Sequence, residues 1–155
     1  MARVEYGNRI GKDVPLRVGA SALIFDERRE KILLTRREDN GEWCLPGGAL
    51  DAGESAEECC IREVYEEIGV RVEVVRLIGI YTSPHQIIVY ADGNRYQVIS
   101  FSFEAKIVEG TPALSPEVTE IAYFASGEIA QIPLMATHRL RIEDALHNQT
   151  AAMIR

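Results

Sequence analysis

Three glutamates, Glu63, Glu66 and Glu67, stand at positions i, i+3 and i+4 of one expected helix. Because a helix turns by about 100° per residue, this spacing places the three carboxylates on one face, within reach of a shared ligand. They fall in the last turns, where the helix dipole disfavours negative charge. A divalent cation reverses that cost, since Mg²⁺ binds through a few carboxylates together with substrate phosphates. The spacing therefore predicts a magnesium site.

The other interpretation of this acidic run is an ordinary solvated helix face, which Glu57 and Glu58 would extend toward the helix start. The fixed surroundings of the glutamates favour the metal site instead. Glycines precede the helix, Glu54 stands at its threshold, Arg62 directly precedes the three glutamates, and Gly69 ends the helix. A helix face that is only exposed to solvent requires none of these neighbouring residues.

With these positions identified, the segment from Gly48 to Val70 resembles the Nudix box, G-x5-E-x7-R-E-U-x-E-E-x-G-U, where U is an apolar aliphatic residue. Every fixed position matches, and Asp51 stands where many members carry Glu. The resemblance implies an α/β fold, the Nudix-type α/β/α sandwich with a mixed sheet, a box helix and a C-terminal helix. It also implies metal-dependent hydrolysis of a nucleoside diphosphate linked to another moiety, with ADP-ribose and nucleoside triphosphates as candidate substrates.

The resemblance also implies a role for individual residues. The cation is expected to be Mg²⁺, with Mn²⁺ as a substitute, and its implied ligands are Gly48 through its backbone carbonyl, Glu63, Glu66 and Glu67. Arg62 and Glu54 would orient these carboxylates. The general base that takes the proton of the attacking water is expected to be Glu66 or Glu67. Because family members differ in this base, Glu117 and Glu120 after the box are alternatives, although both also suit ordinary exposed acids.

Arginines and aromatic residues near the box offer further contacts. Arg36 and Arg37 end an expected strand just before the glycine loop, where a guanidinium can hold a substrate phosphate through paired hydrogen bonds; surface ion pairing is the alternative. Trp43 is expected to close the core rather than stack on a base. His85 is expected to be an exposed loop residue.

The elements that must position these residues follow from periodicity and turn signals. Val18–Phe25 and Lys31–Thr35 are apolar runs joined by a polar segment, which predicts a hairpin. Pro46 and its flanking glycines predict a loop over 43–48. Ser55 with Glu58 forms a capping box that predicts a helix from Ser55 to Ile68.

Later segments predict further strands and a terminal helix. Val70–Tyr81 and Tyr96–Val108 are expected to form a second hairpin, and Glu120–Phe124 another short strand. A helix is expected over Met135–His147, with a partly buried face that comprises Leu140, Ile142 and Leu146. Residues 1–155 are expected to form a single Nudix domain, a mixed-sheet α/β layered structure, in which residues 1–15 are an N-terminal arm or an edge strand.

Composition limits the class of protein. The 155 residues are 46% hydrophobic and 26% charged, with a net charge of −7, which predicts one soluble globular domain. Apolar stretches are too short for a membrane span, and the charged N-terminus indicates a cytoplasmic protein. The acidic balance argues against binding of a DNA or RNA backbone, so the expected partner is a small-molecule nucleotide.

Three cysteines predict reduced thiols. A homodimer is the candidate assembly, since many Nudix proteins form one.

Two rival functions share the expected fold. A non-catalytic Nudix-fold nucleotide sensor would bind its ligand unchanged, but such modules often lose box carboxylates that this chain retains. An isomerase acting on prenyl diphosphates would invoke Trp43 or Cys44, and the intact box argues against it. Products of a cleaved anhydride would separate hydrolysis from both rivals.

Overall fold

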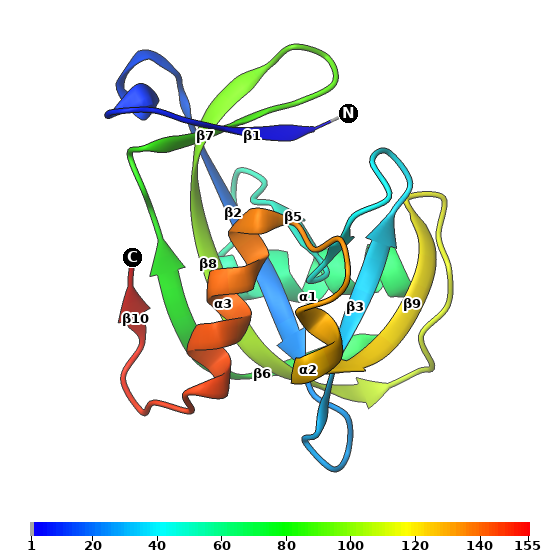
Figure 1. Ribbon diagram of the computed structural model, residues 1–155. Coiled ribbons are helices and arrows are strands. Elements are labelled where there is room, and N and C mark those ends of the chain that lie inside the picture. Colours follow the sequence, from blue (N-terminus) through cyan, green and yellow to red (C-terminus); the bar gives the residue numbers. More distant parts are fainter. Residues whose placement is uncertain (1) are drawn as a thin grey trace.

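The computed structural model describes residues 2–155, and Met1 lies outside the described residues. The strands are β1 Arg3–Tyr6, β2 Leu16–Ile24, β3 Lys31–Arg37, β4 Trp43–Cys44, β5 Gly47–Ala49, β6 Arg71–Tyr81, β7 Gln86–Val89, β8 Arg95–Glu109, β9 Val118–Ala125 and β10 Met153–Ile154. The helices are α1 Ala56–Ile68, α2 Ser126–Ile129 and α3 Ala136–Leu146, with a 3₁₀ turn at Ile10–Asp13. Figure 1 shows their arrangement.

The larger sheet is mixed and is organised around the long strand β8. One edge of β8 pairs in parallel with β2 along the whole of β2. The other edge pairs antiparallel with β6 and, nearer its start, with β7. Strand β10 adds to β6 in parallel, and β1 pairs antiparallel with β7 at the end of the sheet. A second sheet has the order β4-β3-β9.

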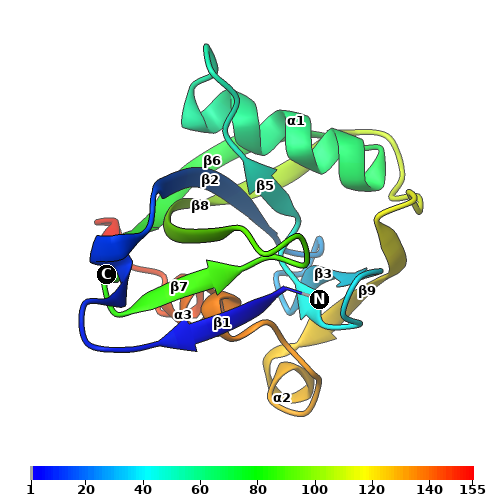
Figure 2. The same ribbon diagram turned by 90° about the horizontal axis from the view of Figure 1, so that it is seen from above.

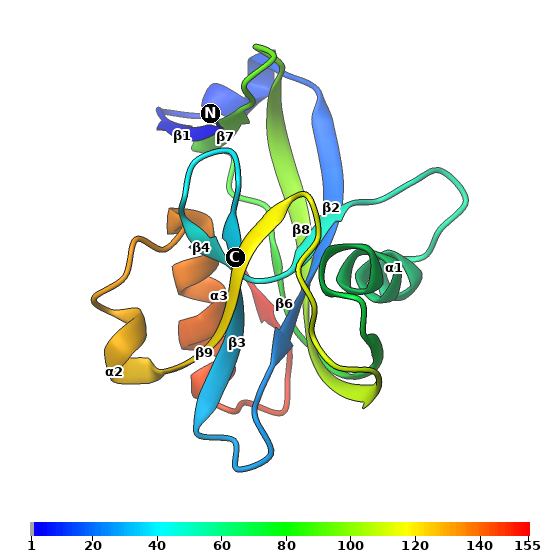
Figure 3. The ribbon, with the colours of Figure 1, turned by 90° about the vertical axis from the view of Figure 1, so that its right-hand side faces the viewer.

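Helices α1 and α3 lie on opposite sides of the sheets, as Figure 3 shows with α1 at the right and α3 at the left. Figure 2, seen from above, shows α1 running across β2, β6 and β8. This is the predicted α/β/α sandwich. No helix among residues 2–155 has the length and apolar character that crossing a bilayer requires.

Strand β2 contributes to the cores on both sides of the larger sheet, because its side chains alternate between the faces. Ala20, Ala22 and Ile24 belong to the cluster under α1. Leu23 belongs to the cluster that includes residues of α3, and the Ser21 hydroxyl accepts a bond from α3. The position of α1 relative to α3 is therefore fixed through one strand.

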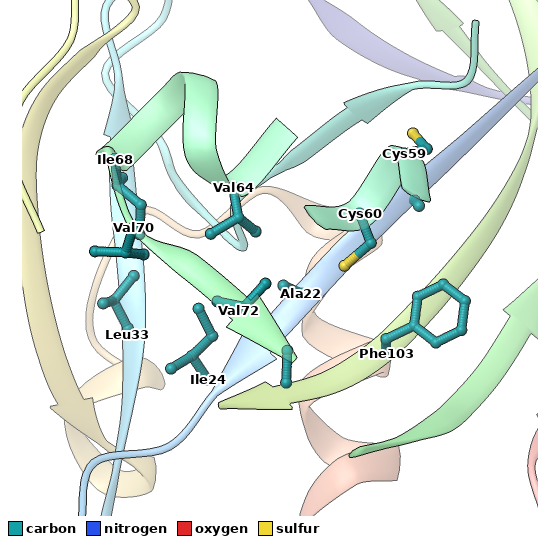
Figure 4. Packing of buried hydrophobic residues seen from close by; sticks show 12 residues of the cluster. Ala22, Ile24, Leu33, Cys59, Cys60, Val64, Ile68, Val70, Val72 and Phe103 are labelled. Atoms are coloured by element: carbon teal, nitrogen blue, oxygen red, sulfur yellow. The ribbon is translucent and has the colours of Figure 1, made fainter. Parts of the chain in front are cut away.

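The cluster under α1 is closely packed and apolar. Figure 4 shows Cys59, Cys60, Val64 and Ile68 of α1 directed toward the sheet, where Phe103 and neighbouring strand residues meet them. All four helix residues are fully buried. Cys59 and Cys60 therefore act as small packing residues between α1 and the sheet.

Helix α1 begins and ends as the sequence predicts. Ser55 Oγ accepts a hydrogen bond from the Glu58 N–H (3.2 Å), and the Glu58 carboxylate accepts one from the Ser55 N–H (2.7 Å). Gly69 closes the helix in the left-handed conformation with φ 72°, a conformation that residues with a Cβ adopt at a cost. The predicted capping box and glycine stop are both confirmed.

One of the two predicted hairpin pairings is wrong. Strands β2 and β3 form no continuous hairpin, since Phe25 and Ile32 make only an isolated bridge before β2 joins β8 and β3 joins β9. The physical reason is that β2 forms a longer ladder with β8, and β3 a longer ladder with β9, than the two strands form with each other. The other predicted pairing is confirmed, because β6 and β8 are antiparallel neighbours. The segment between them contains strand β7, whose apolar residues are buried against β1 and β8.

Two local predictions also need correction. The expected loop over 43–48 contains the short strands β4 and β5, which pair with β3 and β2 on either side of Pro46. In α3, Ile142 is buried, but Leu140 and Leu146 are 39% and 46% exposed. The buried residues of α3 are instead mixed, with His138, Arg141 and Asp144 beside Ile142 and Ala145. Trp43 is buried, with its ring 4.7 Å from Phe124, as expected of a core residue.

The cap of α1 gives a stability prediction. Replacement Ser55→Ala removes the acceptor for the Glu58 N–H and should lower the free energy of unfolding by about 1 kcal/mol in urea denaturation. Ser55→Asp keeps an acceptor at the cap and should retain the stability of the original protein. An alanine variant as stable as the aspartate variant would contradict this role of Ser55.

Candidate functional site

Arg62 occupies the centre of the box on helix α1. Its Nε and Nη2 donate to both oxygens of Glu54 at 2.5 and 2.9 Å, and Nη2 also donates to the Ala49 carbonyl at 2.9 Å. Its Nη1 donates to Glu63 at 2.9 Å and to Glu66 at 3.2 Å. The guanidinium therefore ties the loop before the helix to two of the three predicted metal ligands.

This network fixes the charge of Glu54. The bonds from Arg62 and from the Asp51 N–H lower the pKa of Glu54 to about 2. Hydrogen bonding to Glu54 in turn raises the pKa of Arg62 above its ordinary value. Both groups therefore stay ionised beside the neighbouring carboxylates.

Glu67 points away from Arg62 toward the glycine loop, where its Oε2 accepts a bond from the Gly47 N–H at 3.1 Å. Burial raises the pKa of Glu67 to about 8, and the charges of Glu63 and Glu117 add to the rise. Burial also raises the pKa of Glu63, with Glu66 and Glu117 contributing. Negative charge is therefore crowded here beyond what the protein itself neutralises.

The three box glutamates line one cavity of about 540 Å³ together with Gly48. The protein hydrogen bonds in residues 2–155 engage one oxygen of each carboxylate: Oε1 of Glu63, Oε2 of Glu66 and Oε2 of Glu67. The second oxygen of each stays available. Gly48 lies so close to the Glu63 carboxyl that a Cβ there would collide with it.

The carboxylates do not yet form a closed metal cage. Among residues 2–155, no group of three or more His, Cys, Asp or Glu side chains is gathered closely enough to hold an ion. The expectation of full convergence is therefore too strong for this structure, because Arg62 holds Glu63 and Glu66 while Glu67 turns to Gly47. The chemistry of the donor set nevertheless fits a hard cation, since all the available donors are oxygens.

The expected substrate arginines lie in different surroundings. Arg37 lines the cavity, with its guanidinium bonded to both oxygens of Asp39 at 2.8 and 2.9 Å. Arg36 is not among the cavity residues; it donates to Glu120 at 2.5 Å and to the Gly41 carbonyl at 2.9 Å.

Of the two alternative general bases, one lines the cavity and the other does not. Glu117 lines the cavity that the box glutamates face, and its charge acts on Glu63 and Glu67. Glu120 lies on β9 in the ion pair with Arg36, outside that set of residues. His85 is part of an exposed loop, as expected, and accepts a bond from the Arg9 N–H.

Sequence reasoning missed the wall opposite the glutamates, which α3 supplies. Thr137, His138 and Arg141 line the cavity, and the last two are buried. The three residues stand at i, i+1 and i+4, so α3 turns a polar stripe inward where leucines were expected. The signal was present in the sequence as His138 and Arg141 at i and i+3, a spacing that shares one face.

The comparisons with known proteins agree with this geometry. The NUDIX domain model matches residues 15–146. The chain belongs to the Nudix family. A MutT-like protein of Streptomyces ambofaciens is 34% identical over 116 residues, which cover 75% of this chain and 68% of that protein. An ADP-ribose pyrophosphatase of Methanocaldococcus jannaschii is 33% identical over 122 residues, with 76% and 67% covered.

A solved Nudix hydrolase from Nitrosomonas europaea superposes with a TM-score of 0.71 at 27% identity, covering 90% of this chain and 93% of that one. The resemblance inferred from the box is thus confirmed for family and fold. The predicted enzyme class, a Nudix pyrophosphohydrolase, is confirmed as well.

The raised pKa of Glu67 gives a pH prediction for the metal-free Nudix protein. In the folded state burial raises the pKa of this carboxyl to about 8, from 4.5 for an ordinary glutamate, so between these pH values the folded state holds a proton that the unfolded state has lost. The free energy of unfolding should therefore fall as pH rises through this window. Urea denaturation in a chelating buffer measures it.

Glu67→Gln is the matched variant, because glutamine does not titrate. Its stability should depend less on pH between 5 and 8 than that of the original protein. If the free energies of unfolding of the two proteins changed with pH in the same way, the pKa of Glu67 would not be raised in the folded state, and the prediction would be wrong.

Proposed function

We propose that the chain hydrolyses a phosphoanhydride bond of a nucleoside diphosphate linked to another moiety, with Mg²⁺ or Mn²⁺ as the required cation. One observation carries the proposal: three box glutamates present an available oxygen each to one cavity. Nudix hydrolases generally use divalent metal ions, and the donor set of this site suits one.

In this proposal Glu63, Glu66, Glu67 and the Gly48 carbonyl hold the cation. Once bound, such an ion neutralises charge on the phosphoryl oxygens and lowers the pKa of a coordinated water. Arg62 keeps Glu63 and Glu66 in position and, with Glu54, supports the loop that carries the carbonyl.

The general base is assigned among the acids of the same cavity. Glu66 is the more accessible box residue, with its side chain 57% exposed, whereas Glu67 is mostly enclosed. Glu117 faces the site from the segment before β9. Glu120 is a weaker candidate, because its carboxylate is engaged by Arg36. We therefore propose Glu66, Glu67 or Glu117 as the proton acceptor.

The substrate is proposed to be a small nucleotide, with ADP-ribose and nucleoside triphosphates as the first compounds to assay. The ADP-ribose pyrophosphatase relative supports the first. Arg37 is the proposed phosphate contact, since it lines the cavity and Arg36 does not. The net charge of −7 favours a small ligand held through a cation over a long nucleic-acid backbone.

The main activity test is Glu67→Gln with Mg²⁺ and a panel of nucleotide anhydrides. Turnover should fall at least tenfold, about 1.4 kcal/mol of barrier, because one ligand of the cation loses its charge. Glu57→Gln is the matched control, since Glu57 is exposed on the same helix outside the cavity, and it should retain full turnover. Ligand bound but never cleaved by the original protein would favour a nucleotide sensor.

A second test needs no substrate turnover. Millimolar Mg²⁺ should raise the melting temperature, because a ligand that binds only the folded state stabilises it by mass action. The gain should shrink when Glu63→Gln removes a charged ligand. Identical melting curves with and without Mg²⁺, in the presence of nucleotide, would contradict a cation at these glutamates.

A further inference from the structure

Arg141 of α3 is a buried cation without a carboxylate partner. Its side chain is buried, and no salt bridge in residues 2–155 includes it. The carboxylate one turn later, Asp144, is already bonded to Arg155 and to the Tyr81 hydroxyl. Burial lowers the pKa of Arg141 to about 10, so the guanidinium stays charged at neutral pH. Such a group is costly for the fold alone.

The guanidinium also keeps unused donors. Within the described residues it donates one hydrogen bond, from Nη1 to Ser21 Oγ at 3.2 Å, and Nη1 also lies 3.2 Å from His138 Nε2. Nε is buried with no hydrogen-bond partner among these residues. Nη2 has no protein partner there either, and the residue lines the cavity of the box glutamates.

His138 presents a donor beside this guanidinium. Its Nδ1 accepts a bond from the Leu45 N–H at 2.9 Å, so that nitrogen carries no proton. Burial and the charge of Arg141 hold the pKa of His138 well below its ordinary value, which keeps the ring neutral. The proton of a neutral ring must then sit on Nε2. Arg141 and His138 therefore offer only donors, and a ligand must supply the acceptors.

One wall beside these donors is apolar. Cys44, Ile88 and Met135 form a buried cluster with Tyr90 and Val98 packed against it, and all five line the same cavity. A phosphate or carboxylate gains nothing from such walls. A flat nucleobase uses both features, because its faces pack on apolar side chains while its edge meets the donors.

The donor wall lies close to the box glutamates. His138 is bonded to Leu45, and Glu67 is bonded to Gly47 of the same loop. Two residues of chain span at most about 7 Å, so both anchor points are neighbours within one cavity. A nucleotide with its anhydride at the glutamates can therefore reach α3 with its base.

We infer that Arg141 and His138 form a nucleobase subsite that selects the O6/N7 edge of a 6-oxopurine, guanine or hypoxanthine. O6 and N7 of guanine are both acceptors, which Arg141 Nη2 and His138 Nε2 can meet with one donor each, whereas adenine places an amino donor at N6. The inference rests on the proposed function, which it narrows to guanosine- or inosine-type substrates.

The test is calorimetric binding of guanosine, 7-deazaguanosine and adenosine 5′-monophosphates to the full chain with Mg²⁺. Monophosphates contain no anhydride, so binding is measured without turnover. Guanosine monophosphate should bind at least tenfold more tightly than each of the other two, because 7-deazaguanosine lacks the N7 acceptor. Equal binding of the 7-deaza compound, or tighter binding of the adenosine compound, would overturn the inference.

The matched variants are Arg141→Met and Arg139→Met, both on α3, of which only Arg141 lines the cavity. Arg141→Met should reduce the guanosine preference to less than twofold without lowering the melting temperature, because methionine removes a buried charge that has no carboxylate partner among residues 2–155. Arg139→Met should leave the preference intact. If Arg141→Met fails to fold, the 7-deaza comparison on the original protein still decides. A preference that survives Arg141→Met would overturn the inference.

Two outcomes separate this inference from the proposed function. Equal cleavage of guanosine- and adenosine-containing anhydrides would contradict the nucleobase subsite and support the proposed hydrolase activity. Guanine-selective binding without any cleavage would contradict the proposed hydrolase activity and support the subsite. Loss of inorganic phosphate binding in Arg141→Met, with no preference among bases, would assign the donors to an oxyanion and overturn the inference.

Discussion

The bonds that Arg62 makes around itself are the interaction on which the site depends. Helix α1 carries a dense set of acids near its end, where the helix dipole opposes them. Arg62 compensates part of this charge through Glu54, Glu63 and Glu66, and its bond to Ala49 fixes the glycine loop beside the helix. Glu67 makes no bond to Arg62, and burial, with the charges of Glu63 and Glu117 adding to it, raises the pKa of Glu67.

The cavity has two chemically opposite sides, and each comes from a different layer of the fold. Helix α1 supplies carboxylate oxygens, which can bind a cation. Helix α3 supplies the hydrogen-bond donors of His138 and Arg141, which can bind acceptor atoms of a ligand. The loop from Leu45 to Gly47 touches both, because its N–H groups bond to His138 and to Glu67. Strand β2, which carries core residues on both faces, holds the two layers in place.

Local signals in the sequence predicted the box helix well, because Ser55, Glu58 and Gly69 act within a few residues of one another. Pairing of β2 with β8 was not accessible, since it joins residues about 80 positions apart and depends on competing partners. The box glutamates were identified by spacing. Arg141 was not, because its importance arises from burial and from lacking a carboxylate, which only the folded chain reveals.

The central claim is that the box glutamates hold a divalent cation, and anomalous diffraction from crystals soaked in Mn²⁺ tests it most directly. The account predicts a manganese peak within coordination distance of Glu63, Glu66 and Glu67, at the carboxylate oxygens that Arg62 and Gly47 leave available. A map in which manganese is found only elsewhere, with none beside these three glutamates, would contradict the account.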